Sequence, residues 1–351
     1  MFITGLGTAL PTRFTQQQCW EAARVSAPFQ QLSARGQAIV KAVLLGEPSV
    51  ATRHFGVESV SELFEGGPDE LHARFTRNAP VLAAEAAACA LTDGALDASA
   101  IDAVIVSTCT GYLCPGLTSY VSERLGLRRD VLALDLVGQG CGAALPNLRT
   151  AEALLASGRC GCVLSVCVEV CSAAFYGDED PGVLISACLF GDGAAAAVLS
   201  ASPNRNHRRI EWKTAGSILN PEHRDYLRFE TKGGMLRNIL TQPVPELAGK
   251  YAEQLFSDVM AKHGAARGQI AAWIMHAGGR DVLMHLRKML ALTEEDLRWS
   301  AAVLRDCGNL SSPFVLFVLH AALGGNAPGG LWWMSSFGAG FSCHGALLEV
   351  E

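Results

Sequence analysis

The hydrophobic pattern of this chain alternates helical stretches with short apolar runs. An alanine-rich helix is predicted over residues 82–91, and a second helix ends at Ala156, where Gly158 is placed to cap it. Three apolar runs have the length and composition of buried strands, at residues 101–106, 131–136 and 162–168. This alternation predicts an α/β protein with buried sheets.

The same order of elements occurs twice. Residues 270–275 match the run at 101–106 at an offset of 169 residues, and a helix precedes each of them at the same distance. The turn around Cys141 lies opposite the turn around Asn309 at an offset of 168 residues. Helix–strand units resemble one another in general, but a duplicated half explains the shared spacing better.

We therefore expect two repeated α/β halves, residues 1–201 and 210–351, with two sheets packed around shared central helices. The polar and basic stretch at residues 202–209 between them is the best candidate for a linker. A chain of 351 residues can bury roughly three quarters of its unfolded surface, so a large common core is available.

Composition and charge exclude several classes of protein. Half of the residues are hydrophobic and 18% are charged, which excludes a disordered chain. A net charge of −6 argues against a nucleic-acid or anionic-membrane surface. No apolar run reaches the ~18 to 20 residues of a membrane span, and the start of the chain reads as a strand rather than a signal peptide. We expect a cytoplasmic protein.

Twelve cysteines are the unusual feature of the composition. Their spacing forms no zinc motif, so no metal is expected, and most of them read as small buried hydrophobic residues in a reducing compartment. Cys141 differs because glycine flanks it on both sides, in a turn between a predicted strand and a predicted helix.

Two interpretations of this turn compete. Gly138, Gly140 and Ala143 satisfy a weak dinucleotide-binding pattern, with Glu169 at the end of the next strand. Alternatively, Cys141 is a nucleophile at a helix N-terminus, where the helix dipole lowers the pKa of the thiol and the flanking glycines let a substrate thioester approach.

Two residues of the second half are candidate partners of such a nucleophile. His276 ends a predicted strand and precedes two glycines, although a structural role for such a histidine is equally common. Asn309 occupies the position equivalent to Cys141, and its alternative role is a helix N-cap. If the two helix N-termini point at one pseudo-twofold centre, all three side chains meet in one site.

Five motifs in this order and spacing resemble the type III polyketide synthases of the chalcone synthase superfamily. They are Gly140-Cys141-Gly142, the run from Leu189 to Ala195, His276-Ala277-Gly278-Gly279, the run from Gly308 to Ser312, and Phe337-Gly338-Ala339-Gly340. The resemblance covers nearly the whole chain and implies the α/β thiolase-like fold, a duplicated αβαβα arrangement that is usually a homodimer. It implies acyl-CoA and malonyl-CoA as substrates and no cofactor.

The resemblance also implies roles for individual residues. Cys141 would accept the acyl group, and His276 and Asn309 would stabilise the thiolate and then the enolate formed by decarboxylation. Phe190 would be the gatekeeper between the coenzyme A tunnel and the cavity. The positions implied to line the cavity are Cys109, Cys114, Cys171 and Ser311, and those implied to bind coenzyme A are Arg53, Gly278 and Gly279.

Small side chains at Cys114 and Cys171 favour a cavity that opens toward the interior and accepts a long-chain fatty acyl-CoA starter. The expected product is then an alkylresorcinol or alkylpyrone. The alternatives are a malonyl-only synthase making a hydroxynaphthalene, a synthase making a dihydroxyphenylacetyl-type product, and a 3-ketoacyl-carrier-protein synthase III. Outside this class, the dinucleotide pattern would make the chain an NAD-dependent oxidoreductase. A degenerate binding scaffold is disfavoured because all three catalytic positions are intact.

Overall fold

The computed structural model describes residues 1–46, 49–175, 177–204 and 208–351. Its strands are β1 (Phe2–Ala9), β2 (Thr12–Thr15), β3 (Thr52–Phe55), β4 (Ala103–Thr108), β5 (Leu132–Val137), β6 (Cys162–Glu169), β7 (Gly193–Ser200), β8 (Ile210–Leu219), β9 (Leu227–Lys232), β10 (Met235–Leu240), β11 (Ile270–Met275), β12 (Gly330–Gly338) and β13 (Ser342–Val350). Its helices are α1 (Gln16–Ala23), α2 (Ala27–Gln30), α3 (Ala34–Leu45), α4 (Pro68–Asp93), α5 (Leu117–Leu125), α6 (Ala144–Ala156), α7 (Pro181–Leu189), α8 (Val244–His263), α9 (Arg280–Met289), α10 (Arg298–Cys307) and α11 (Phe314–Gly324).

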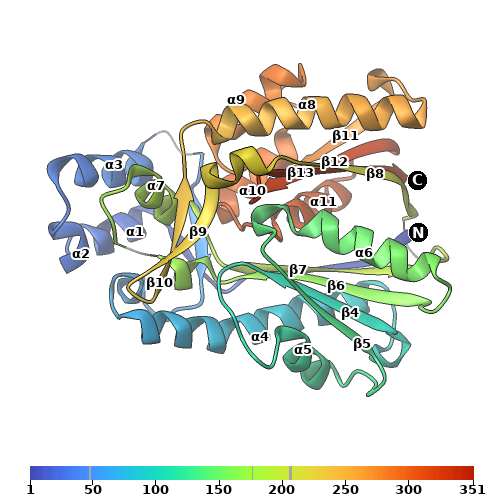
Figure 1. Cartoon of the computed structure of the whole chain (residues 1–351), viewed down its shortest axis with the longest axis horizontal. Helices are drawn as coiled ribbons and strands as arrows, with labels where there is room; N and C mark the ends of the chain where they lie inside the picture. The colour runs from blue at the N-terminus through green and yellow to red at the C-terminus, as the bar shows by residue number, and fades with distance from the viewer. Residues whose placement is uncertain (47–48, 176, 205–207) are drawn as a thin grey trace.

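The chain folds into alternating layers of helix and sheet (Figure 1). Helices α8 and α9 cover one outer face, α6 and α11 lie in the middle, and α4 and α5 cover the other outer face. Two sheet layers separate them, and both chain ends lie at the same end of the molecule. This is the duplicated α/β arrangement that the sequence predicted.

The two halves repeat the same strand pairing. In the first, β7 pairs antiparallel with β1 and β6, and β4 pairs parallel with β6; in the second, β13 pairs antiparallel with β8 and β12, and β11 pairs parallel with β12. The expectation of two separate sheets is wrong in one detail. A single pairing of Phe2 with Glu211 joins β1 to β8, so the strands form one nine-stranded sheet with β5 at one edge and β11 at the other.

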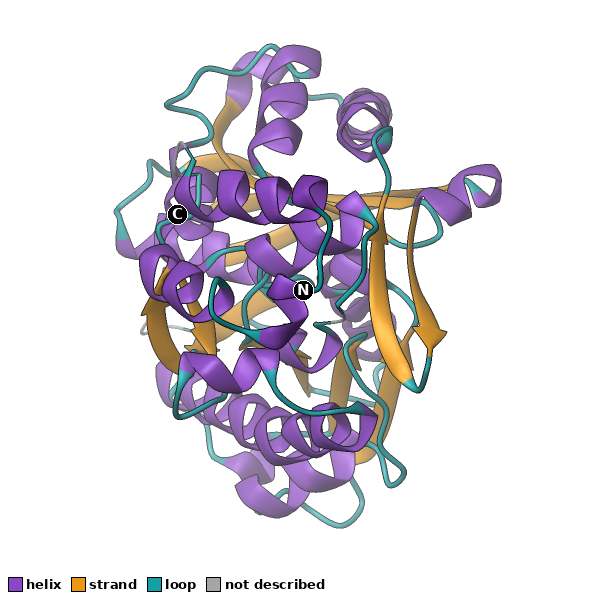
Figure 2. Ribbon diagram, turned by 90° about the vertical axis from the view of Figure 1, so that its left-hand side faces the viewer, coloured by secondary structure: helices purple, strands orange, loops and turns teal. Residues whose placement is uncertain are grey.

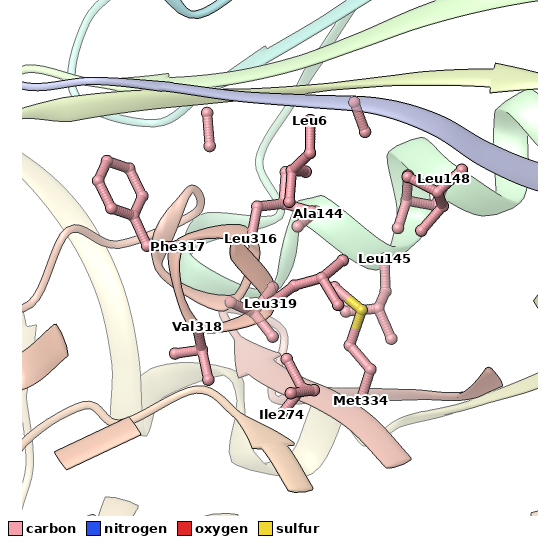
Figure 3. Packing of buried hydrophobic residues seen from close by; sticks show 14 of the residues in the cluster. Leu6, Ala144, Leu145, Leu148, Ile274, Leu316, Phe317, Val318, Leu319 and Met334 are labelled. Carbon is pink, nitrogen blue, oxygen red and sulfur yellow. The ribbon is translucent and has the colours of Figure 1, made fainter. Parts of the chain in front are cut away.

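The core lies between the two sheet layers, around α11. This helix is apolar on all sides because sheets cover it from both directions. Figure 3 shows Leu316 and Leu319 of α11 between Leu6 of β1 on one side and Ile274 and Met334 of the second half on the other. The core therefore belongs to both halves. The division at residues 202–209 stays a prediction, and residues 205–207 of that linker lie outside the described residues.

Most of the predicted elements are confirmed with small shifts. The strands predicted over 101–106 and 131–136 are β4 and β5, and the helix ending at Ala156 is α6. The helix predicted over 82–91 begins earlier, at Pro68, and continues through Pro80. Apolar residues on both sides of this proline are buried on one face of the helix, so packing outweighs the local propensity.

Two small sheets flank the layered body. Strands β2 and β3 pair near the N-terminal helices, and β9 and β10 form a hairpin that stands upright at the left of Figure 1 and at the right edge of Figure 2. Both sheets adjoin the site described below. No helix in the described part of the chain has both the length and the apolar character needed to cross a membrane.

Candidate active site

Cys141 lies in a tight 3₁₀ turn, Gly140–Gly142, between the end of β5 and the start of α6. Gly138 and Gly140 have φ angles of 84° and 55°, in the left-handed region that favours glycine. The chain therefore reverses direction within a few residues. This reversal buries the Cys141 side chain in the interior of the molecule.

The glycines of this turn are needed for packing against the second half of the chain. A Cβ atom on Gly140 would lie 3.2 Å from a backbone nitrogen of the turn between β12 and β13, and a Cβ atom on Gly338 would lie 2.5 Å from the Gly142 nitrogen. The Ser336 hydroxyl donates to the Gly142 carbonyl oxygen at 3.2 Å. The flanking glycines thus accommodate the chain itself, and the expectation that they also let a substrate approach stays a prediction.

Burial dominates the electrostatics of the Cys141 thiol. It raises the pKa of Cys141 to about 12, and the contact between the Cys141 Sγ and the Ser311 Oγ, at 3.3 Å, offsets this only in part. The prediction that the helix N-terminus lowers the pKa is therefore wrong for this structure. Burial therefore favours the protonated thiol, and a nucleophilic role for Cys141 would require a base beside it.

His276 supplies a neutral imidazole next to the cavity. It follows β11, is 1% exposed, and lies edge-on between the rings of Phe314 and Phe337, each 5.0 Å away. Burial lowers the pKa of His276 to about 3, and neither ring nitrogen has a hydrogen-bond partner among the described residues. One ring nitrogen can therefore accept a proton while the other donates a hydrogen bond.

Asn309 is held rigidly by its own amide and backbone. Its Oδ1 accepts a hydrogen bond from the Ser311 backbone N–H at 2.8 Å, and its Nδ2 donates to the Gly278 carbonyl oxygen at 3.2 Å. The N-cap of α11 is Pro313, so Asn309 is not the cap of this helix. An amide carries two N–H donors, and the second is available to a group in the cavity.

One cavity of about 540 Å³ brings the three predicted catalytic residues together. Cys141, His276 and Asn309 all lie in its wall, and Phe190 lies there with them. Phe190 follows α7 and forms an isolated bridge with Asn309, so the two residues are neighbours in the backbone as well. Residues of α3, α7, α9 and the end of β10 complete the wall.

The other cysteines predicted to line the cavity are placed differently from one another. Cys171 packs with Cys141 and Phe190 in one buried cluster, and the Cys109 Sγ lies 3.6 Å from the Ser311 Oγ. Both lie close to Cys141, but neither they nor Ser311 are among the residues that form the wall of this cavity. Cys114 is exposed, because the loop that follows β4 carries it to the surface. The prediction of Cys109, Cys114, Cys171 and Ser311 as lining residues is therefore wrong for the cavity of this chain.

Glu169 is a buried carboxylate that the sequence suggested only as a ribose ligand. Its oxygens accept hydrogen bonds from the Cys109 thiol at 3.2 Å, the Thr110 hydroxyl at 2.9 Å and the Ser312 hydroxyl at 2.5 Å. It is fully buried, so a nucleotide cannot reach it. Burial raises the pKa of Glu169. The hydroxyl residues around Cys109 and after Ser311 were the sequence signal for this network.

Arg53 does not bind a coenzyme A phosphate. It is 3% exposed, and its guanidinium donates to the carbonyl oxygens of Ala187 at 2.6 Å and Phe190 at 3.0 Å. The other two predicted coenzyme A residues, Gly278 and Gly279, do lie in the cavity wall. Arg280, which the sequence analysis missed, follows them there as the first residue of α9.

Family models for "Chalcone and stilbene synthases" match most of the chain. The N-terminal domain model matches residues 58–203, and the C-terminal domain model matches residues 218–345. Two relatives named 3,5-dihydroxyphenylacetyl-CoA synthase, from Streptomyces toyocaensis and Amycolatopsis balhimycina, are each 32% identical over 69% of this chain. The matches span 64% and 66% of the length of these two relatives.

Solved structures of the same class share the fold over almost the full length. The chain is similar to PKS-I from the brown alga Ectocarpus siliculosus, with 25% identity, a TM-score of 0.89 and coverage of 99% of this chain and 98% of that one. It is also similar to 1,3,6,8-tetrahydroxynaphthalene synthase from Streptomyces coelicolor A3(2), with 24% identity, a TM-score of 0.87 and coverage of 100% and 99%. The fold, and the family models that match more than half of the sequence, show that this chain belongs to the chalcone and stilbene synthase family of type III polyketide synthases.

Proposed function

We propose that this chain is an acyltransferase that condenses an acyl-CoA starter with malonyl-CoA by decarboxylative Claisen condensation and then cyclises the product. One observation carries this proposal: Cys141, His276 and Asn309 share the wall of one buried cavity with Phe190. A nucleophile, a base and an amide donor are the groups that acyl transfer and enolate formation require.

The first step loads the starter. The Cys141 sulfur attacks the carbonyl carbon of the starter thioester, and its proton passes to the His276 imidazole in the same step, because burial opposes a separate thiolate and imidazolium. The carbon–sulfur bond to coenzyme A breaks, and coenzyme A leaves as the thiol after it takes up the proton. The starter is then bound to Cys141 as a thioester, and His276 is neutral again.

The second step forms the carbon nucleophile. The bond between the malonyl carboxylate and its neighbouring carbon breaks, carbon dioxide leaves, and the electron pair forms an enolate on the thioester oxygen. The His276 ring N–H and the free N–H of Asn309 Nδ2 donate to this oxygen, and each such donor contributes about 3 kcal/mol. The enolate carbon attacks the starter thioester and releases the Cys141 thiolate.

The starter has two candidates. A long-chain fatty acyl-CoA, giving an alkylresorcinol or alkylpyrone, was inferred from small side chains at Cys114 and Cys171. Neither Cys114 nor Cys171 is among the residues of the cavity wall, so the structure does not support that argument. A small-starter synthase making a dihydroxyphenylacetyl-type product is the second candidate, and the names of the two curated relatives favour it.

Product mass spectrometry distinguishes these candidates. The purified protein is incubated with malonyl-CoA alone and with malonyl-CoA plus a panel of short and long acyl-CoAs. A fatty starter predicts alkylated products only when the long acyl-CoA is present. A malonyl-derived starter predicts the same product with or without the long acyl-CoA. If the protein turns over neither mixture, the proposed condensation is contradicted.

Coenzyme A is proposed to bind at the end of the cavity formed by Gly278, Gly279 and Arg280. The first two residues carry no side chain, and Arg280 adds a positive charge that can bind a phosphate. Arg280→Glu should raise the KM for malonyl-CoA with little change in kcat. A lower kcat at unchanged KM would place this arginine elsewhere in the reaction.

We also propose a homodimer formed through the edge strand β5. This strand ends the nine-stranded sheet and carries exposed apolar side chains, with Leu132 at 43% and Val137 at 63% exposure. An unpaired apolar edge favours pairing with another strand. Light scattering after gel filtration should give a dimer for the wild type and a monomer for Leu132→Lys; a wild-type monomer contradicts the proposal.

A cytoplasmic location is proposed from the thiols. None of the twelve cysteines forms a disulfide bond, and two of them, Cys109 and Cys171, lie close to Cys141. Unpaired thiols at this density are typical of a reducing compartment. Fractionation of the source cells with an antibody against the chain tests this location.

A further inference from the structure

We propose that Arg53 is a positioning residue that holds the gatekeeper Phe190 and the catalytic Asn309 in register. Its guanidinium is buried and binds three acceptors: the carbonyl oxygens of Ala187 and Phe190 and, at 2.9 Å, the Gln16 Oε1. It also lies 4.8 Å from the ring centroid of Phe55. The inference rests on the function proposed above.

The first reason lies at the end of α7, the helix that leads into Phe190. The last carbonyl groups of a helix receive no hydrogen bond from an N–H group of the same helix, so they need donors from elsewhere. Arg53 supplies two of them, to Ala187 and Phe190, and the Gln16 side chain donates to the Cys188 carbonyl at 3.0 Å. A cation at this end is also favoured by the helix dipole.

The remaining donor comes from the catalytic asparagine itself. The Asn309 backbone N–H donates to the Leu189 carbonyl at 2.9 Å, and the Asn309 carbonyl accepts from the Gly191 N–H at 3.0 Å. The end of α7 and the turn that carries Asn309 are thus hydrogen-bonded to each other. Any shift of one moves the other.

The second reason lies at the end of α10, the helix that leads into Asn309. The start of β3, the strand of Arg53, and the residue before it bind this end too: the Ala51 N–H donates to the Arg305 carbonyl at 2.7 Å, and the Thr52 hydroxyl donates to the Asp306 carbonyl at 2.5 Å. The Arg53 stem also packs closely here, because a Cβ atom on Gly308 would lie 2.9 Å from its Cγ.

Arg53 therefore lies between the C-terminal end of α7, which precedes Phe190, and the C-terminal end of α10, which precedes Asn309. Without the guanidinium, the carbonyl groups of Ala187 and Phe190 lose a donor. The backbone bridge between Phe190 and Asn309 can then move relative to the cavity. The Cys141 turn is held independently, by the β12–β13 turn and Ser336. Loss of Arg53 should therefore impair decarboxylation more than acyl loading.

The test compares two reactions in Arg53→Met and Arg53→Lys. Malonyl-CoA decarboxylation is measured as kcat and KM, and loading of Cys141 is measured by intact mass after mixing with an acyl-CoA. We expect Arg53→Met to lower the decarboxylation kcat by about 10- to 100-fold, the scale of a displacement near 1 Å, with KM and loading close to wild type. Arg53→Lys should recover part of the loss, because an ammonium group keeps the charge without the planar fork.

A matched control is Arg208→Met. The Arg208 guanidinium also donates to a backbone carbonyl, that of Ala327 at 2.7 Å, and lies 5.2 Å from the Trp332 ring, but it donates to neither Phe190 nor the helix that leads into it. This variant should leave the ratio of the two reactions unchanged. Equal losses of decarboxylation and loading in Arg53→Met, or no loss at all, overturn the inference.

Hydrogen exchange gives a second measurement that does not need activity. The amides of Gly191 and Asn309 should exchange faster in Arg53→Met than in the wild type and in Arg208→Met. If Arg53→Met does not fold, Gln16→Met weakens the same assembly and should show the same pattern to a smaller extent. Unchanged exchange overturns the positioning role, whereas a wild type that does not decarboxylate malonyl-CoA overturns only the proposed function.

Discussion

Replacing Asn309 by aspartate tests the proposed enolate site with little change of shape. Asn309→Asp keeps the Oδ1 that accepts from the Ser311 N–H at 2.8 Å, but it removes both N–H donors of Nδ2. Loss of one donor to a developing oxyanion lowers kcat about 10²- to 10³-fold, which corresponds to about 3 to 4 kcal/mol. A carboxylate at this position also repels the enolate, so the loss should reach at least the upper part of this range.

The assay follows the consumption of malonyl-CoA by liquid chromatography and, in parallel, the mass of the acyl adduct on the protein. Cys141 and His276 are unchanged in Asn309→Asp, so adduct formation should stay close to that of the wild type. The matched control is Asn326→Asp, at an exposed position just after α11, which should affect neither reaction. Decarboxylation by Asn309→Asp near the wild-type rate would refute the assignment of the amide as the enolate donor.

Three further predictions concern the nucleophile, the pH dependence and the core. Cys141→Ala should abolish the acyl adduct, and an adduct that persists on another cysteine would contradict the assignment. Burial lowers the pKa of His344 from 6.5 to about 4, so the unfolded chain takes up a proton in this range, and about 3 kcal/mol of stability present above pH 6.5 is lost as the pH falls to 4. His344→Gln should therefore gain stability relative to the wild type in urea unfolding as the pH falls from 7 to 4.5; an unchanged difference argues against this. Leu319→Ala, at a fully buried position of α11, should cost about 2 to 5 kcal/mol of unfolding free energy by the same method, and a cost below about 1 kcal/mol would contradict the packing in Figure 3.

The sequence could predict that Cys141, His276 and Asn309 share one site because their signals are local. Cys141 has glycine on both sides, His276 ends an apolar run before two glycines, and Asn309 occupies the repeat position of Cys141. Each signal depends on a strand end or a helix start, which a short stretch of sequence reveals. The repeat offset then indicates that the three positions meet, without any knowledge of their distances.

The roles of Arg53 and Glu169 could not be predicted from the residues next to them in the sequence. Arg53 was predicted to bind coenzyme A from the family resemblance, but its acceptors at Ala187 and Phe190 lie 134 and 137 residues away in the chain. Glu169 was a candidate ribose ligand at a strand end, and the donor that helps to enclose it, Ser312, is 143 residues away. Whether a charged side chain is exposed or buried depends on which distant segment packs over it.

The site lies where the two halves meet, and this position explains its dependence on glycine. The Gly142 carbonyl is bound by Ser336 of the second half, the Cys141 thiol contacts Ser311 of the second half, and Phe190 pairs with Asn309 across the same boundary. At two points along it, added Cβ atoms would come within 2.6 Å of backbone atoms of the opposite half: from Gly338 to Gly142, and from Gly308 to Leu189. Real Cβ contacts do not come this close, so a side chain at either glycine would separate Cys141 or Phe190 from the residues that it contacts in the opposite half. Neither half alone holds Cys141, His276 and Asn309 together, so the proposed reaction requires both halves of the duplicated fold.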